Sequence, residues 1–246
     1  MKNFLFELCV ESLQSARAAE AGGADQIELC ADLQIGGVTP SIDLMRTTIE
    51  ELAIPVHVLI RPRGGNFVYS AQELIAMRSH VDQAKLAGAA GVVLGVQRAD
   101  GSVDVERSRS LVELAHPMKV TFHRAFDTAK NLSEALEAVI LTGADCLLTS
   151  GGKPDVLAGA DTIRRLHEQA DGRLEVMAGG GLTLVNLVQV VRRSGVSCLH
   201  GSLTGSPQNG VSGKKRAVRD TAMLEADVQE AVRLLAAEMK LRMTSP

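Results

Sequence analysis

Short apolar runs recur along the chain, and each is followed by a segment in which apolar positions repeat with helical spacing. The runs are rich in Val, Ile and Leu and are nearly continuous, which indicates parallel strands buried on both faces. The pattern predicts eight strand-helix units, with strands at LFELCV (5–10), QIELCA (26–31), PVHVLIR (55–61), GVVLGV (91–96), KVTFHR (119–124), CLLTSG (146–151), LEVMAGGG (174–181) and SCLHGS (197–202).

A weak repeat of two strand-helix pairs underlies this order. Similar leaders introduce the even strands, namely GGADQIEL, GAAGVVLG, GADCLLTS and GVSCLHGS. Because parallel strands with right-handed crossovers can close on themselves, we predict an α/β fold, a single TIM-like (β/α)8 barrel forming one domain over residues 1–246. An open doubly wound sheet is the alternative, and it is disfavoured because no GxGxxG fingerprint follows the first strand.

Local signals mark helix starts and one loop. Thr39 before Pro40 predicts a capping hydroxyl followed by proline at the first helical position. Ser70 and Glu73 have the spacing of a capping box. After the last strand, residues 205–220 (GSPQNGVSGKKRAVRD) have the composition of a surface loop, and we interpret their basic cluster as solvated surface.

Composition narrows the classes of function. Of the 246 residues 46% are hydrophobic, with no Trp and one Tyr, so the core must be aliphatic. A net charge of −3 and few aromatic side chains predict no binding to nucleic acid and none to membranes. Four cysteines without paired spacing, no cleavable apolar leader and no long apolar span predict a soluble cytoplasmic protein with reduced thiols.

Charged side chains end several predicted strands, and barrel proteins build their sites at those carboxyl ends. Arg61 and Arg63 end the third strand, where a guanidinium fork suits a carboxylate or phosphate. Because charges inside a barrel are costly unless paired, we expect a network of acidic and basic groups at this mouth. The alternative is that these ion pairs only hold loops. The catalytic candidates are Glu28, His57, Arg61, His123, Arg124 and Asp127, and Glu7 and Arg63 are ligand-binding candidates.

Small residues follow the sixth, seventh and eighth strands. Backbone amides of the last loops often bind phosphate in such barrels, which predicts an anion site. Tight turns also require glycine, so simple turn chemistry is the alternative. The further ligand-binding candidates are Ser150, Gly151, Gly179, Gly180 and Ser202.

Cys9 and Cys30 lie on neighbouring predicted strands, with side chains expected on the same face. Cu(I) favours soft thiolate ligands, and adjacent strands run about 4.8 Å apart, so the two thiolates could share a linear Cu(I) ion. The alternative is that both are inert core cysteines, because free cysteine commonly behaves as a small buried hydrophobe. Cys146 and Cys198 begin the sixth and eighth strands, and we interpret them as structural.

Seven blocks of the sequence resemble the signature blocks of the CutC family, named for copper homeostasis. They are FELCVES, GADQIELC, GGVTPS, IPVHVLIRPRGGNFVYS, VTFHRAFD, LLTSGGKPD and VMAGGG, and they span nearly the whole chain. The resemblance implies a TIM-like barrel, a cytoplasmic location, a homo-oligomer (dimer or tetramer) and a role in copper handling or tolerance. Family members often carry a second cysteine beside the cysteine of the first strand, and that place is Val10 here.

Two hypotheses of function follow. The first is a copper homeostasis protein that binds Cu(I) through Cys9 and Cys30. The second is a barrel enzyme acting on a small anionic metabolite, phosphorylated or carboxylated, with arginine clamps and an acid-base group among the Glu, His and Asp candidates. An oligomeric scaffold with a vestigial pocket is a third possibility.

Overall fold

The computed structural model describes residues 4–203 and 220–244, and its strands form a closed parallel barrel. Each strand pairs with the next in chain order and the first pairs with the last, so the predicted (β/α)8 barrel is confirmed. Nearly all of the predicted loop at 205–220 lies outside the described residues. The strands are β1 (Leu5–Val10), β2 (Gln26–Leu29), β3 (Val56–Leu59), β4 (Gly91–Leu94), β5 (Lys119–Phe122), β6 (Cys146–Thr149), β7 (Glu175–Gly179) and β8 (Cys198–Gly201).

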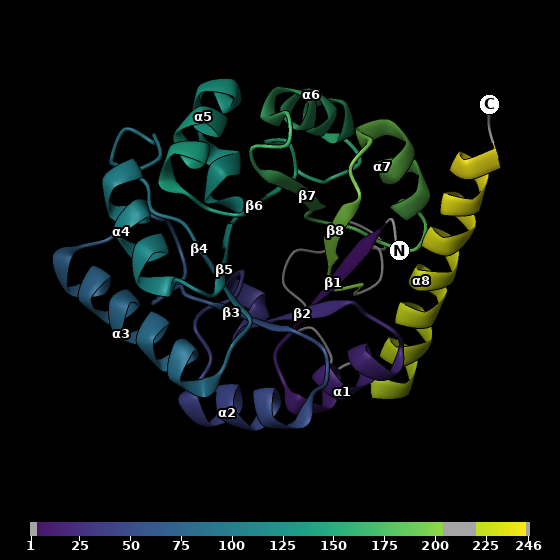
Figure 1. Ribbon diagram of the computed structural model, residues 1–246, viewed down its shortest axis with the longest axis horizontal. Coiled ribbons are helices and arrows are strands. Elements are labelled where there is room, and N and C mark those ends of the chain that lie inside the picture. Colours follow the sequence, from purple (N-terminus) through teal and green to yellow (C-terminus); the bar gives the residue numbers. More distant parts are fainter. Residues whose placement is uncertain (1–3, 204–219, 245–246) are drawn as a thin grey trace.

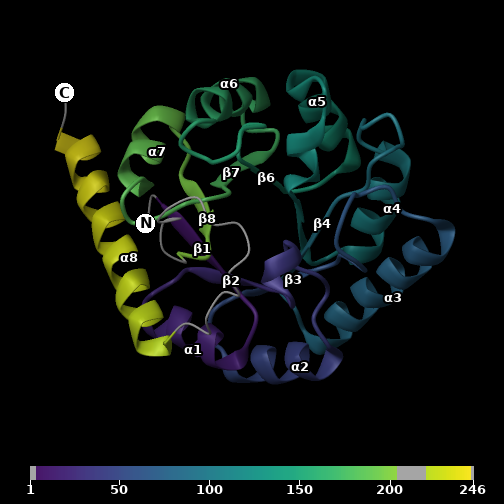
Figure 2. The same cartoon turned by 180° about the vertical axis from the view of Figure 1, so that it is seen from behind.

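Helices surround the barrel as an outer ring (Figures 1 and 2), with α8, drawn in yellow, packed beside α1 and α7. No helix in the described ranges is long and apolar enough to cross a lipid bilayer. The α-helices are α1 (Leu13–Ala21), α2 (Ile42–Glu51), α3 (Ala71–Ala87), α4 (Val105–Ala115), α5 (Leu132–Thr142), α6 (Ala160–Ala170), α7 (Leu187–Ser194) and α8 (Thr221–Thr244), and the 3-10 turns are η1 (Leu33–Ile35) and η2 (Arg124–Thr128).

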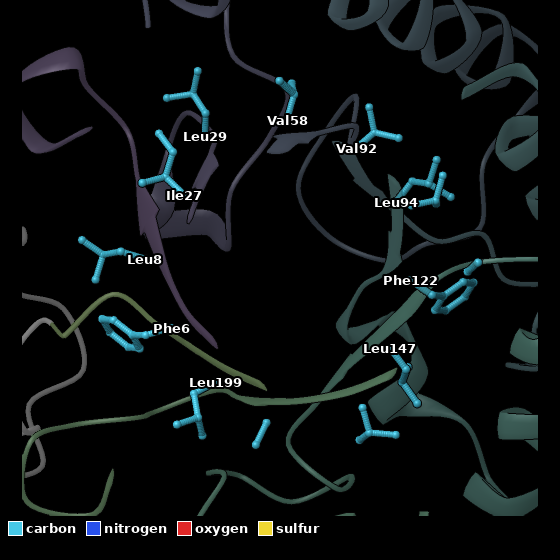
Figure 3. Close-up of a cluster of buried hydrophobic side chains, with 14 of the residues drawn as sticks. Phe6, Leu8, Ile27, Leu29, Val58, Val92, Leu94, Phe122, Leu147 and Leu199 are labelled. Carbon is cyan, nitrogen blue, oxygen red and sulfur yellow. The ribbon is translucent and has the colours of Figure 1, made fainter. Parts of the chain in front are cut away.

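The main apolar core lies between the strands and the helices. Side chains alternate along a strand, so Phe6 and Leu8 of β1 belong to this core, whereas Glu7 and Cys9 face the barrel interior. Figure 3 shows the apolar side chains distributed around the ring of strands. Each fully buried Leu or Phe contributes about 1.5–3 kcal/mol, so this outer layer holds the strands in register and leaves their inner faces free for polar chemistry.

Two histidine rings inside the barrel pack against glycine residues of the neighbouring strand, where the absence of a side chain leaves room for the ring. A Cβ on Gly91 would lie 2.7 Å from the ring of His57, and a Cβ on Gly95 would lie 2.6 Å from Nδ1 of His123. Real Cβ atoms do not approach other atoms so closely, so these two positions of the β4 segment require glycine for steric reasons.

The capping signals are confirmed in one place and wrong in another. Ser70 and Glu73 form the predicted capping box at the start of α3. The predicted start at Thr39 and Pro40 is wrong, because Ser41 caps α2. The hydroxyl of Thr39 instead accepts the backbone N–H that follows β3, which ties this segment to the barrel and delays the helix.

Candidate functional site

A cavity of about 600 Å³ opens at the carboxyl ends of the strands. Since water occupies about 30 Å³ per molecule, this space holds on the order of 20 waters, far more than a single ion needs. Its polar lining consists of Cys9, Glu28, Arg61, His123, Arg124, Thr183, His200 and Ser202, with Gly180 among its loop residues. The sequence-predicted residues outside this lining are Glu7, Cys30, His57, Arg63, Asp127, Ser150, Gly151 and Gly179.

An ion pair between the first and last strands lies beneath the cavity floor. Glu7 is opposite His200 in the β1–β8 register, and Nδ1 of His200 donates to Oε1 of Glu7 at 2.7 Å. Gln26 donates to the other carboxylate oxygen at 2.7 Å. Burial alone would raise the pKa of Glu7, but the hydrogen bond and charge of His200 outweigh it and lower that pKa. At His200 the hydrogen bonds with Cys9 and Glu7, together with the charges of Glu28 and Glu7, outweigh burial and raise its pKa well above its usual value, so the pair is carboxylate and imidazolium.

Glu28 is the buried carboxyl group that faces the cavity. Its side chain is 7% exposed, and Oε1 accepts a long hydrogen bond from the Cys9 thiol at 3.7 Å. Oε2 has no hydrogen-bond partner within residues 4–203 and 220–244, and it lies 3.9 Å from Nδ1 of His200. Burial, and to a smaller extent the charge of Glu7, raises the pKa of Glu28 to about 7 against the opposing charge of His200. Glu28 therefore exists in both protonation states near neutral pH.

The structure brings Cys9 and Cys30 together. Their sulfur atoms are 3.6 Å apart, and the thiol of Cys30 also donates to the backbone oxygen of Val10 at 3.5 Å. Cys9 lines the cavity, whereas Cys30 is fully buried behind it. The hydrogen bond with Cys30, burial and the negative charge of Glu28 raise the pKa of Cys9 well above its usual value, so Cys9 is a thiol in the free protein.

Two more predicted histidines lie in the barrel, in different surroundings. His57 approaches Glu7 at 3.5 Å below the cavity, and burial lowers its pKa despite that carboxylate. His123 lines the cavity, and its Nδ1 accepts the N–H of Ala125 at 3.3 Å. Burial and then the charge of Arg61 lower the pKa of His123 to about 3, so its ring is neutral, and its Nε2 has no hydrogen-bond partner.

The arginines of the RPRGG stretch hold loops. Arg61 lines the cavity, but its terminal nitrogens donate to backbone oxygens of Gly37 and Gly65, at 2.7 and 2.8 Å. Arg63 pairs with Glu73 and stacks over a tyrosine ring away from the cavity. The expected network therefore differs in its pairing, because Glu7 and Glu28 lie against histidine and the two arginines bind carbonyl groups and an α3 glutamate.

Arg124 is the arginine available at the cavity rim. Its Nε donates to Asp127 at 2.9 Å and its Nη2 to Ser150 at 3.1 Å, while its Nη1 has no hydrogen bond among the described residues. Asp127 also accepts the N–H groups of Ser150 and Gly152, so it orients the arginine and the β6 loop together. Gly180 has φ +102°, and a Cβ there would lie 2.8 Å from Cζ of Arg124, so the guanidinium lies directly on the glycine backbone.

His200 is the site residue that sequence reasoning missed. LHGS was interpreted through its small residues alone, as an anion-binding loop. The available signal was strand parity, because His200 ends the eighth strand and a closed barrel sets that strand beside Glu7 of the first.

The fold and these side chains define the class: a TIM-barrel protein with thiol, carboxylate and imidazole groups gathered at the floor of its mouth cavity. The chain belongs to the CutC family, whose model matches residues 4–205, so the resemblance drawn from the sequence is confirmed. It is 43% identical over 221 residues to the human copper homeostasis protein cutC homolog, covering 90% of this chain and 81% of that one. It is 47% identical over 201 residues to a CutC family protein of Chromobacterium violaceum, covering 82% and 81%.

Solved structures agree with the fold. The crystal structure of the CutC protein of Streptococcus agalactiae superposes with a TM-score of 0.76 at 30% identity, covering 81% of this chain and 98% of that one. A thiamine phosphate pyrophosphorylase of Pyrococcus furiosus superposes with a TM-score of 0.61 at 16% identity, covering 97% and 98%. The second likeness concerns the barrel alone.

Proposed function

We propose that this protein takes part in copper homeostasis and binds Cu(I) between Cys9 and Cys30. The observation that carries the proposal is the 3.6 Å separation of the two sulfur atoms at the cavity floor. With metal–thiolate bonds of about 2.3 Å, a linear ion needs sulfurs about 4.6 Å apart, so each sulfur has to move by about 0.5 Å. The names of the human and bacterial relatives support the copper role.

The thiols must lose their protons when the ion binds. Because the pKa of Cys9 is raised, protons compete with Cu(I), and the affinity should increase with pH. The proposal includes a cytoplasmic location, where thiols stay reduced, and a homo-oligomer of two or four chains, as the family resemblance implies.

Competition with a coloured Cu(I) chelator, in ascorbate and without oxygen, tests the copper site. The Cys9→Ser/Cys30→Ser variant should lose tight binding, because serine lacks the soft donor. The matched control is Cys146→Ser/Cys198→Ser, which changes the other cysteine pair, near the amino ends of β6 and β8, and should bind as the wild type does. Equal affinity in both double variants would show that the Cys9–Cys30 pair is not the copper site.

A second candidate function is an enzyme acting on a small anionic metabolite. The observation that favours it is Arg124, whose free Nη1 lies at the rim of a cavity much larger than an ion. In this function Arg124 clamps a phosphate or carboxylate, and Glu28 and His123 of the lining are the acid-base candidates. His57 and Asp127, outside the lining, are then positioning residues.

Thermal unfolding in inorganic phosphate and in a panel of small carboxylates tests this second function. Binding to the folded state should raise the midpoint of the wild type. Arg124→Lys keeps the charge but loses the planar fork, so its midpoint should rise less. A wild-type protein whose midpoint responds to none of these anions would rule out the anion clamp.

A further inference from the structure

We propose that Glu7, Glu28 and His200 form a metal site distinct from the cysteine pair, for a divalent first-row ion such as Zn²⁺ or Cu²⁺. One potential ligand atom from each of the three residues lies within 4.8 Å of the other two. Nδ1 of His200 is 2.7 Å from Oε1 of Glu7 and 3.9 Å from Oε2 of Glu28. The three donors come from β1, β2 and β8, and β8 lies beside β1 only because the barrel is closed.

An independent observation is the unpartnered oxygen of Glu28. Oε2 is buried and makes no hydrogen bond to any residue that the structure describes, and Glu28 lines the cavity. Buried acceptors are nearly always satisfied, so an unsatisfied carboxylate oxygen aimed at an imidazole nitrogen indicates a missing cation or ligand.

The charges of the cluster also favour a bound cation. Two buried carboxylates face one imidazolium, and Gln26 adds only a neutral amide. His57 approaches the other carboxylate oxygen of Glu7 at 3.5 Å. The cluster therefore holds two buried carboxyl groups beside one imidazole, and a divalent cation bound between them would place positive charge next to both carboxyl groups.

The donor set selects the class of ion. Metal–oxygen and metal–nitrogen bonds of about 2.1 Å put tetrahedral ligands about 3.4 Å apart, so each donor has to move by less than about 1 Å. Two carboxylates with one imidazole suit Zn²⁺ and Cu²⁺, whereas Mg²⁺ and Ca²⁺ prefer six or more oxygen ligands. Three protein ligands leave the fourth coordination position of a tetrahedral ion open. Because Glu28 and His200 line the cavity, this open position would face the cavity, as it does in metal sites that bind a substrate.

Binding of Co²⁺ tests the site, because its visible absorption distinguishes thiolate ligands from oxygen and nitrogen ligands. The test uses the Cys9→Ser/Cys30→Ser background, which removes the sulfur donors and separates this inference from the Cu(I) proposal. We expect one Co²⁺ per chain, with ligand-field bands and no thiolate charge-transfer band. Adding Glu28→Gln or His200→Gln should weaken binding at least about tenfold.

The matched control in the same background is Glu50→Gln, an exposed carboxylate on α2, which should bind Co²⁺ unchanged. Glu28→Gln keeps the side-chain shape and removes a buried charge, so it should fold, and circular dichroism checks this. Loss of all Co²⁺ binding in the double-serine background would overturn the inference, as would equal affinity with and without Glu28→Gln. Cu(I) binding that survives the serine changes would contradict only the copper proposal.

Discussion

Replacing Glu28 with glutamine should stabilise the protein at alkaline pH. Glu28 has a pKa of about 7 in the folded state, mainly through burial, against a usual value of 4.5. The difference between these two pKa values corresponds to about 3 kcal/mol, at about 1.4 kcal/mol for each pKa unit. A neutral amide of the same shape avoids this cost, because it needs no counter-charge.

The sign of the pH dependence follows from proton binding. Between pH 4.5 and 7 the folded protein keeps the proton on Glu28 and the unfolded chain has released it. This contribution to stability is therefore fully present below about pH 4.5 and is lost as the pH rises through 7. From pH 5 to pH 8 the stability of Glu28→Gln relative to wild type should increase by about 2–3 kcal/mol.

Urea unfolding of both proteins at pH 5 and pH 8, with EDTA present to remove metals, measures this change. At an m-value of about 3 kcal/mol per molar, the difference between the two midpoints should change by about 0.8 M between the two pH values. Glu50→Gln, an exposed change on α2, should show the same difference from wild type at both pH values. A constant difference for Glu28→Gln as well would refute the reasoning, because it would mean that Glu28 titrates alike in the folded and unfolded states.

Three further predictions concern single contacts. Gly91→Ala should destabilise the protein by about 1–3 kcal/mol in urea unfolding, since its Cβ meets the ring of His57, and a neutral effect would mean that the ring can move aside. His200→Gln should cost about 3–5 kcal/mol at neutral pH, because Glu7 loses its cation, and an effect below 1 kcal/mol would contradict the ion pair. Arg124→Met should abolish any phosphate-dependent rise in the thermal midpoint, whereas an unchanged rise would place the anion elsewhere.

The sequence predicted the fold well because its signals are local and repeated. Eight apolar runs separated by helical patterns predict eight parallel strands with helical crossovers. Few topologies connect such strands by right-handed crossovers, and the closed barrel is one of them. Strand parity also predicted that Cys9 and Cys30 face the same way, and their sulfurs are 3.6 Å apart. Both predictions depend on two signals that the sequence contains: the alternation of side chains along a strand and the order of the strands along the chain.

The pairing of charges was less predictable, for a physical reason. Arg61 binds backbone oxygens of Gly37 and Gly65, and backbone carbonyls carry no mark in the sequence. The histidine partner of Glu7 was missed because it lies on the eighth strand, and only barrel closure makes that strand adjacent to the first. Residue types alone favour arginine as the partner of a carboxylate. The register between β1 and β8 instead places His200 opposite Glu7.

Barrel closure also determines when the site comes into existence during synthesis. The Glu7–His200 hydrogen bond joins residues 193 positions apart. At about 5–20 residues per second, a ribosome needs about 10–40 s to add the second partner after the first. Until then Glu7 and Cys9 of β1 lack the imidazole of His200, so a nascent or truncated chain without β8 lacks the complete donor set. The metal site that we propose for this set is therefore complete only in chains whose synthesis has passed the last strand.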